Sequence, residues 1–265
     1  MERLRAAGCP SWALTERPQR SRILLEAYMQ RRAAAISLAR QFGGRVRPVH
    51  PRDWSQSCPA PPTRIGRRLQ IIHAGTPGPK GDLPRLHIPH GMAFGSGEHA
   101  TTHMLLQALT RHEGCGGISV LDLGTGSGIL ALAARLSGAR KVVATDFDPD
   151  AVRTARQNEA LNFPAPRIGW RCADVKRLRA TARYDLVLAN LFSGILCEAA
   201  PQIAGSVAPG GQLWLGGILR SQQEEVLAAY RGQGLRLARA VNRGKWVMLQ
   251  LQESVSGVNK TTQTK

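Results

Sequence analysis

One stretch, residues 118–148, constrains the fold of this 265-residue chain more than any other. Residues 120–123 suit a strand that is buried on both faces, and residues 129–136 stay apolar over a helical length. Between these segments lie Gly124, Gly126 and Gly128. Because glycine has no Cβ, it permits positive φ in a turn and lets a ligand touch the backbone at the carboxyl end of the strand. The stretch therefore predicts a strand, a glycine turn, a helix and a second strand, as in a doubly wound α/β sheet.

The spacing of the glycines separates two classes of cofactor. The dinucleotide fingerprint G-x-G-x-x-G would need glycine at position 129, where this chain has Ile129. Asp122 instead opens the pattern D-x-G-x-G-x-G, which resembles motif I of class I methyltransferases. That resemblance implies S-adenosylmethionine, held through its amino-acid end and ribose by Asp122 and the three glycines. A tight turn without a ligand is the alternative.

Asp146 ends the second strand of this stretch. A carboxylate at that point can accept hydrogen bonds from both ribose hydroxyls, as an acidic residue about 20 positions after the glycines does in dinucleotide folds. Asp146 is therefore an expected cofactor-binding residue.

The charge of the chain is strongly positive and concentrated near its start. The net charge is +18, from 36 basic residues, of which 30 are Arg, and 18 acidic residues. Residues 1–68 carry 14 Arg against four acidic residues, a net charge of +10. A field of this sign favours phosphate-rich partners, so this region is a candidate for contact with RNA. For Arg31, Arg32 and Arg40, an ordinary solvated helix face is the alternative.

Cysteine usage and hydropathy bear on the compartment. The five cysteines are odd in number and lack C-x-x-C spacing, which favours a reduced, cytoplasmic interior. No run reaches the roughly 18 apolar residues needed to cross a bilayer. We therefore expect a cytoplasmic protein without a membrane span, and nothing in the sequence calls for a metal ion.

The remaining segments predict the following organisation. Residues 1–20 lack a sustained period, and we expect them to be disordered. Residues 21–42 predict one helix, capped by Ser21, within a reduced basic appendage at 21–68. Residues 45–54 and 64–73 read as strands, 69–87 as linker and strand, 88–251 as the main α/β domain, and 252–265 as a disordered tail. Within the main domain we expect helices at about 149–161, 193–207 and 221–230, and strands at 168–173, 185–190, 212–215, 235–240 and 246–251.

Residues 88–102 form a second glycine-rich stretch, which enters a helix near Thr101. Such a loop offers backbone N–H groups and threonine hydroxyls to a ligand, although an ordinary helix cap is the alternative. This stretch and the segments that follow motif I resemble the ribosomal protein L11 methyltransferase (PrmA) family along residues 46–251. The segments, in chain order, are residues 92–109, 120–134, 144–152, 188–196, 209–230 and 245–251.

The resemblance implies a Rossmann-like class I methyltransferase fold with a seven-stranded sheet. It also implies an enzyme that transfers methyl groups to lysine or N-terminal amines of a large-subunit ribosomal protein, which is either free or part of a ribosomal particle. It also implies that the N-terminal appendage is a reduced form of the family's substrate-binding domain. Ala100, Gly216 and the pair Gly244–Lys245 depart from the family's usual residues. The last departure puts positive charge near the expected target side of the site.

Four further residues are candidates for the site. Asn190 lies at the carboxyl tip of a buried strand, where it can orient an amine and contact the cofactor, or simply end the strand. His99 has an unperturbed pKa suited to taking the proton of an amine whose own pKa is about 10.4. A histidine that braces the loop, with water as proton acceptor, is the alternative. Thr102 is an expected cofactor contact, and Asp174 a partner for the adenine amino group or a solvated loop acid.

Other functions compete with this interpretation. The net charge favours an RNA methyltransferase, but Asn190-Leu191-Phe192 lacks the NPPY signature of many enzymes that methylate base amino groups. A methyltransferase acting on another protein lysine fits the same motifs. A non-catalytic ribosome-binding protein on this scaffold is disfavoured by the intact motif I and Asp146.

Overall fold

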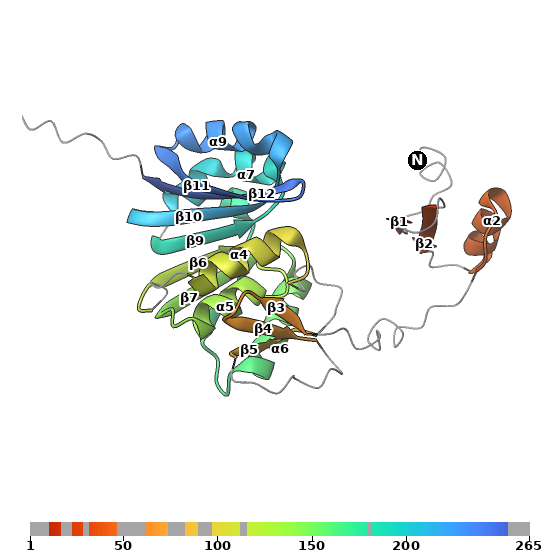
Figure 1. Ribbon diagram of the computed structural model, residues 1–265, viewed down its shortest axis with the longest axis horizontal. Helices are drawn as coiled ribbons and strands as arrows, with labels where there is room; N and C mark the ends of the chain where they lie inside the picture. The colour runs from red at the N-terminus through yellow and green to blue at the C-terminus, as the bar shows by residue number, and fades with distance from the viewer. Residues whose placement is uncertain are drawn as a thin grey trace, which may run out of the picture. The chain divides into compact units, whose positions relative to one another are not determined.

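The computed structural model describes residues 11–16, 23–28, 32–46, 62–73, 83–89, 97–111, 116–179 and 182–253 (Figure 1). The chain divides into two compact units, residues 1–54 and 55–265, and each is described by itself. The predicted boundary at residue 68 therefore falls inside the second unit. Within the described ranges, no helix is long and apolar enough to cross a membrane.

The first unit contains an antiparallel strand pair and a helix. Strand β1 (Ser11–Glu16) pairs with β2 (Ile23–Tyr28), and α2 (Arg32–Phe42) follows. Two predictions were wrong here: residues 11–16 form a strand rather than disordered chain, and the helix predicted over 21–42 begins only at Arg32. Pairing with β1 outweighs the helix propensity of the second segment, an effect that local sequence does not reveal. Most of the strand predicted at 45–54 lies outside the described residues.

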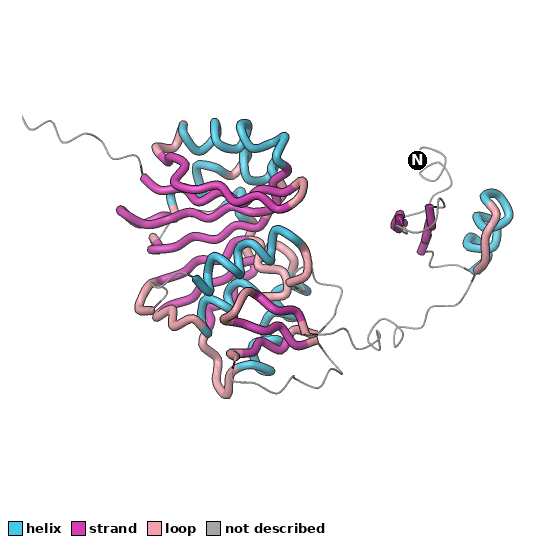
Figure 2. The backbone as a smooth tube through the Cα atoms, viewed as in Figure 1, coloured by secondary structure: helices cyan, strands magenta, loops and turns pink. Residues whose placement is uncertain are grey.

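The second unit is built on the predicted seven-stranded sheet, whose strands lie in the order β11-β12-β10-β9-β6-β7-β8 (Figures 1 and 2). Only β12 runs antiparallel to its neighbours; the other pairings in the sheet are parallel. The strands are β6 (Ser119–Leu123), β7 (Lys141–Asp146), β8 (Ile168–Cys172), β9 (Tyr184–Asn190), β10 (Val207–Leu219), β11 (Leu235–Arg243) and β12 (Trp246–Glu253).

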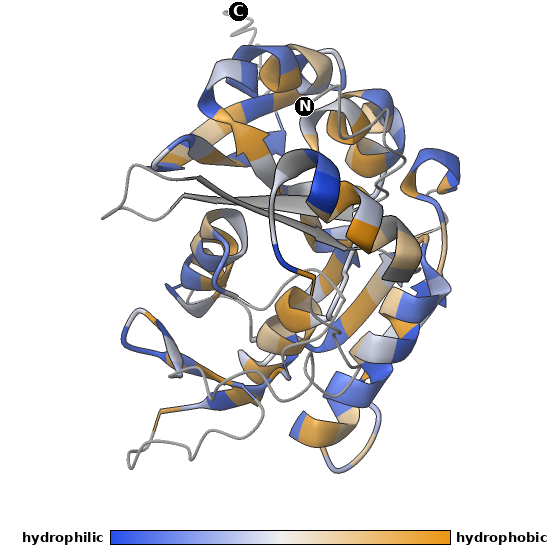
Figure 3. Ribbon diagram, turned by 90° about the vertical axis from the view of Figure 1, so that its right-hand side faces the viewer, coloured by the Kyte–Doolittle hydropathy of each residue, from blue (hydrophilic) through white to orange (hydrophobic). Residues whose placement is uncertain are grey.

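Helices cover both faces of this sheet. One face packs against α4 (Ala100–Arg111), α5 (Ile129–Leu136) and α6 (Pro149–Asn162), and the other against α7 (Ser193–Glu198), α8 (Ala200–Gly205) and α9 (Gln223–Arg231). Short 3-10 helices η1 (Val175–Arg177) and η2 (Arg220–Gln222) complete the set. Successive residues of a strand enter opposite cores, for example Leu186 and Val187 of β9. In Figure 3 the helices carry both hydrophobic and hydrophilic residues.

A small three-stranded sheet packs against α4, α5 and α6. Its strands β3 (Thr63–Ile65) and β4 (Leu69–Ile72) form a hairpin, and β5 (Arg85–His87) pairs parallel with β4. The single strand predicted over 64–73 was wrong, because residues 66–68 turn the chain. Strands β4 and β5 lie within the segment predicted as linker and strand at 69–87, and Ile71 and Leu86 are both fully buried in the core that they share with α4 and α5. Residues 74–82, between these strands, lie outside the described residues.

Two element boundaries also differ from prediction. The helix expected over 193–207 is divided into α7 and α8, because Pro201 in the first turn of α8 cannot continue a preceding helix. Strand β10 is longer than expected, since its pairing with β9 and β12 extends from Val207 to Leu219. Helix α5 spans the predicted residues.

The strand order reverses between β6 and β9. From β6 the chain winds outward through β7 to β8, and it returns to the other side of β6 at β9. In open α/β sheets ligands bind at such a switch point, outside the carboxyl ends of the strands. The predicted doubly wound fold is confirmed, and the motif I turn follows β6 at this point.

Candidate active site

The β6–α5 turn is shaped by its three glycines. Gly124, Gly126 and Gly128 have φ angles of +69°, +56° and +84°. The N–H groups of Gly124 and Thr125 both donate to the Thr145 carbonyl at 2.9 Å, which ties the turn to the end of β7. A side chain would disfavour the positive φ angles, so the backbone here stays bare toward the sheet edge.

Two of these glycines also leave no room for a Cβ. A Cβ on Gly124 would lie 2.3 Å from Leu191 Cδ2, and one on Gly128 would lie 2.8 Å from Trp170 Cη2. Neither neighbour was singled out from the sequence. Residues distant in sequence, Leu191 just after β9 and Trp170 within β8, thus pack against the turn, so the glycines permit close packing as well as an exposed backbone.

Asp146 is buried and holds the same turn through its carboxylate. Its Oδ2 accepts from the N–H of Gly126 at 2.9 Å, and its Oδ1 accepts from the N–H of Asp148 at 3.1 Å. Each oxygen therefore has a fixed donor and a remaining lone pair. This arrangement orients the carboxylate at the end of β7 for a further donor.

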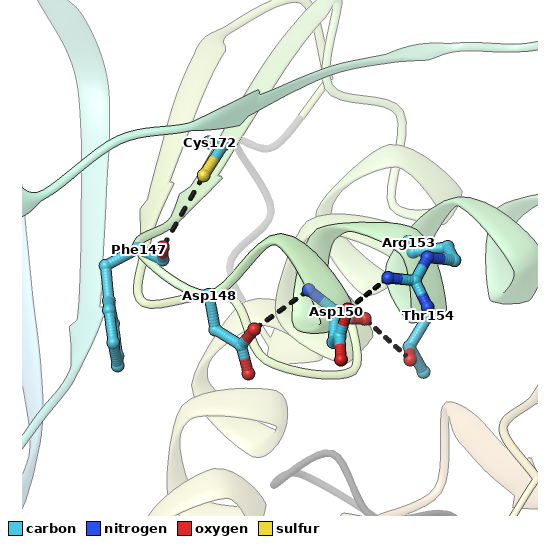
Figure 4. A network of polar contacts seen from close by, with 6 residues as sticks. All are labelled: Phe147, Asp148, Asp150, Arg153, Thr154 and Cys172. Carbon is cyan, nitrogen blue, oxygen red and sulfur yellow. Dashed lines mark hydrogen bonds and ion pairs between the residues drawn. The ribbon is translucent and has the colours of Figure 1, made fainter.

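Helix α6 starts immediately after Asp146 with a local polar network (Figure 4). Asp148 caps the helix by accepting from the N–H of Asp150 at 2.8 Å, and Pro149 follows at the first helical position. The Phe147 carbonyl accepts from Cys172 Sγ at 3.5 Å, while the Phe147 ring points away from this network and is 77% exposed. An apolar ring is thus exposed to solvent at the carboxyl end of β7, next to β6 in the sheet.

Asp122 is completely buried in β6. Its Oδ2 accepts from the Thr125 hydroxyl, and its Oδ1 has no hydrogen-bond partner among the described residues. Burial raises the pKa of Asp122 to about 7, and the nearby Asp146 contributes in the same direction. A cation or a hydrogen-bond donor that approaches such a carboxyl favours its ionised form.

Asn190 ends β9 and contacts Thr102 of α4. Its Nδ2 donates to Thr102 Oγ1 at 3.1 Å, while its Oδ1 is buried and has no partner in the described part of the chain. Gly216 of β10 lies opposite, and a Cβ there would lie 2.7 Å from Asn190 Oδ1. The Asn190 side chain therefore has its donor engaged and its acceptor buried without a partner, against a glycine whose lack of a side chain makes room for Oδ1.

His99 precedes α4 and is held from two sides. Its Nδ1 lies 2.8 Å from Thr101 Oγ1, and its ring meets the Trp246 ring edge-on, with centroids 4.9 Å apart. Burial lowers the pKa of His99, and the charge of Lys245 lowers it further. The imidazole is therefore neutral near pH 7, packed against the first residue of β12.

Asp174 lies beyond the end of β8 and takes part in a local turn. It caps η1 by accepting from the N–H of Lys176 at 2.9 Å, and its carboxylate lies 4.0 Å from Arg177 Nε. The preceding residue, Ala173, donates to the Asp146 carbonyl at 2.8 Å. Asp174 is thus on the same edge as the other candidates but contacts none of them.

Several residues at this edge were not predicted from the sequence. Leu191 lies between Gly124 and Gly217, where a Cβ on Gly217 would lie 2.2 Å from the Leu191 carbonyl. Phe192 follows and is 74% exposed. A pair of glycines at the end of β10 is the signal that could have indicated a close approach. Among the described residues, no group of three or more His, Cys, Asp or Glu side chains could hold a metal ion.

Comparisons with known proteins agree with this arrangement. The family model "Ribosomal protein L11 methyltransferase (PrmA)" matches residues 19–254. Relatives named ribosomal protein L11 methyltransferase are 39% identical in Geobacter metallireducens, over 85% of this chain and 74% of the relative, and 41% identical in Pseudomonas aeruginosa, over 78% and 72%. The crystal structure of a ribosomal protein L11 methylase from Lactobacillus delbrueckii subsp. bulgaricus has a TM-score of 0.66 at 27% identity, covering 72% of this chain and 98% of that one.

Proposed function

This chain belongs to the ribosomal protein L11 methyltransferase (PrmA) family, and from that premise we propose that it methylates lysine side-chain or N-terminal amines of the large-subunit ribosomal protein L11. It is an S-adenosylmethionine-dependent methyltransferase of the class I fold. The relatives are named for a protein substrate, which favours this function over RNA methylation. The proposed compartment is the cytoplasm, because the substrate is a ribosomal protein.

The residues at the switch point fit S-adenosylmethionine. The cofactor carries an amino-acid end with an ammonium group, a ribose with two hydroxyls, and a sulfonium that supplies an electrophilic methyl group when bound. Asp122 offers a buried carboxylate oxygen without a partner, which suits a cation near the turn. Asp146 keeps one lone pair on each oxygen for ribose hydroxyls. The bare backbone of the glycine turn completes this side of the site.

For the adenine end we propose Asp174, whose carboxylate is at the same sheet edge beyond β8. The exposed ring of Phe147 lies between Asp146 and the start of α6 and offers an apolar surface there. Both assignments follow from the position of Asp174 and Phe147 at the carboxyl ends of β8 and β7, the edge of the sheet where ligands bind in this fold.

The observation that carries the proposal is that Asn190 Oδ1, at the strand tip, has no hydrogen-bond partner among the described residues. A primary amine must be neutral to attack the methyl group. Asn190 Oδ1, at the strand tip, can accept a hydrogen bond from the amine and so turn the nitrogen lone pair toward the methyl donor. Thr102 engages the amide donor and so fixes which end of the side chain is open. We therefore assign Thr102 to positioning Asn190, in place of the cofactor contact expected from sequence.

The contacts of His99 support a positioning role rather than proton transfer. Thr101 holds its Nδ1, and Trp246 covers its ring. His99 thereby keeps the start of α4, which carries Thr102, against the start of β12. Water then takes the proton of the target amine.

The first unit supplies a basic contact with ribosomal RNA in this proposal. Residues 1–54 carry 11 Arg and four acidic residues, a net charge of +7. Such a charge would favour substrate bound in ribosomal particles over free protein.

The test is a transfer assay with radiolabelled S-adenosylmethionine, purified chain and ribosomal fractions that lack the modification. We expect label in ribosomal protein L11, with mass spectrometry locating it on amines. Label found only in RNA would contradict the proposal.

A further inference from the structure

A hollow of about 720 Å³ lies at the surface beyond the carboxyl end of β10. Its walls come from the last residue of β10, the start of η2 and α9, and the turn between β11 and β12. The side chains that matter are those of Arg220, Glu224, Asn242 and Lys245. None of these has a role in the methyl-transfer chemistry described above.

The hollow adjoins the proposed amine site. Gly216 of β10 is in register with Asn190, and three residues further on Leu219 is in register with Trp246. The Arg220 N–H donates to the Lys245 carbonyl at 2.9 Å, which joins the two walls of the hollow. Trp246, the next residue after Lys245 of the lining, packs on His99, which connects the hollow to the candidate site through one residue.

Its charge is positive toward solvent. Arg220 and Lys245 are exposed, and neither forms a salt bridge within the described ranges. The one carboxylate in the lining, Glu224, is already paired with Arg231 at 2.9 Å. Lys245 Nζ lies 5.5 Å from the centre of the Trp246 ring, so its charge stands beside the site. The lowered pKa of His99 is consistent with this proximity.

We propose that this hollow binds a carboxylate of the protein substrate that lies within a few residues of the amine to be methylated. The inference rests on the proposed function and adds a rule for choosing among amines. A side-chain carboxylate or a chain terminus matches the two cations, whereas a second lysine at that place is repelled. Asn242 at the rim supplies a neutral polar neighbour for the same group.

The experiment uses the full chain and ribosomal protein L11 whose methylated amine has been located by mass spectrometry. Residues within three positions of that amine are replaced singly by Glu or by Lys, and kcat/KM is measured for each. We expect Glu to be preferred over Lys by about three- to tenfold, the range that one or two partly screened charge pairs supply. The preference should shrink as salt is added.

Charge reversal in the enzyme locates the effect. Lys245→Glu is expected to abolish or reverse the preference, and Arg220→Glu to weaken it. Lys141→Glu makes the same charge change at the amino end of β7, the opposite edge of the sheet, and should leave the preference intact. An equal effect of Lys141→Glu would overturn the proposal in favour of net charge alone.

Other outcomes separate this inference from the function on which it rests. Transfer to amines with equal kcat/KM for Glu and Lys neighbours overturns the inference and leaves the function standing. No transfer to any amine overturns both. If a short single-stranded RNA inhibits wild type but not Lys245→Glu, and the neighbours have no effect, the hollow binds phosphate and the proposal is wrong.

Discussion

Asp122 and Asp146 are buried carboxylates on neighbouring strands, and they differ in what they accept. Asp146 receives two backbone N–H groups, whereas Asp122 receives the Thr125 hydroxyl and interacts with the backbone of Ala131, and its Oδ1 has no hydrogen-bond partner by geometry among the described residues. Hydrogen bonds to a carboxylate stabilise its ionised form, and burial without them stabilises the protonated form. At Asp122 burial dominates and raises the pKa to about 7, so the charge of this residue changes with pH near neutrality.

For Asp122, we expect the affinity for S-adenosylmethionine to fall as pH drops below about 7, the value to which burial raises its pKa. Below that pH the carboxyl is protonated, and a cationic ligand must displace the proton in order to bind. The dissociation constant then rises by up to about tenfold per pH unit, and it is constant just above the pKa. Calorimetry at a series of pH values measures it.

Two variants serve as controls for that pH profile. Asp122→Asn should bind S-adenosylmethionine weakly, without the dependence of affinity on pH. Asp146→Asn should bind about ten- to a hundredfold more weakly at every pH and keep that dependence.

The stability of the protein without ligand is a second measurement that depends on Asp122. Because the folded pKa of Asp122 is raised, its contribution to stability is present below pH about 4 and is lost as pH rises to about 7. A flat binding profile for wild type would contradict the role of Asp122.

Asn190 is expected to act mainly in the transition state, because its open acceptor positions the amine. Asn190→Ala should lower kcat by about ten- to a hundredfold, equivalent to one lost hydrogen bond of about 1.5 to 3 kcal/mol, with little change in cofactor affinity. Steady-state kinetics with calorimetry separate the two effects. If only the cofactor Michaelis constant rises, Asn190 is a cofactor ligand and not a positioning group for the amine.

At the scale of elements, the site is closed by two glycine segments that clamp the connection from β9 to α7. The β6–α5 turn approaches the side chain of Leu191 at Gly124, and the end of β10 approaches its backbone at Gly217. Both glycines have positive φ, +69° and +80°. The positions of Asn190 and Leu191 therefore depend on elements on either side of β9.

This clamp predicts a difference between two similar substitutions. Gly124→Ala and Gly217→Ala should each destabilise the fold by about 1 to 3 kcal/mol through strained φ and overlap. The added Leu191→Ala removes the overlapping side chain beside position 124, so it should partly restore Gly124→Ala. It should not restore Gly217→Ala, whose overlap is with the Leu191 carbonyl. Thermal unfolding of the single and double variants checks this, and equal rescue of both would contradict the clamp.

The same elements show what the sequence could and could not predict. Helix α5 and the start of α6 at residue 149 were predicted correctly, because the signals for them act within a few residues. The β1–β2 pair was missed, since it depends on a partner strand rather than on local propensity. The orientation of Asn190 was likewise hidden, because its partner Thr102 is 88 residues away. The roles assigned to the site residues remain predictions.

At the scale of the whole molecule, charge is divided between two units. Residues 1–54 have a net charge of +7, and they include β1, β2 and α2. Of the three helix arginines noted in the sequence, Arg40 is exposed on α2, and Arg45 just after it is exposed as well. Exposed arginines outside the catalytic unit suit a contact with phosphate that is independent of the chemistry.

If this unit tethers the enzyme to ribosomal RNA, methylation of assembled particles should be steeply salt-dependent, because binding releases counterions. Each lost phosphate contact reduces the slope of log affinity against log salt by about 0.7 to 0.9. We expect a chain lacking residues 1–54 to have lower activity and a flatter slope on particles, with little change on free ribosomal protein. Arg40→Gln with Arg45→Gln, in the full chain, removes two exposed charges and keeps the unit itself, so it should reproduce part of the effect. Rates measured across a salt series on both substrates decide the matter: equal slopes for particles and free protein would mean that these arginines only solvate the surface.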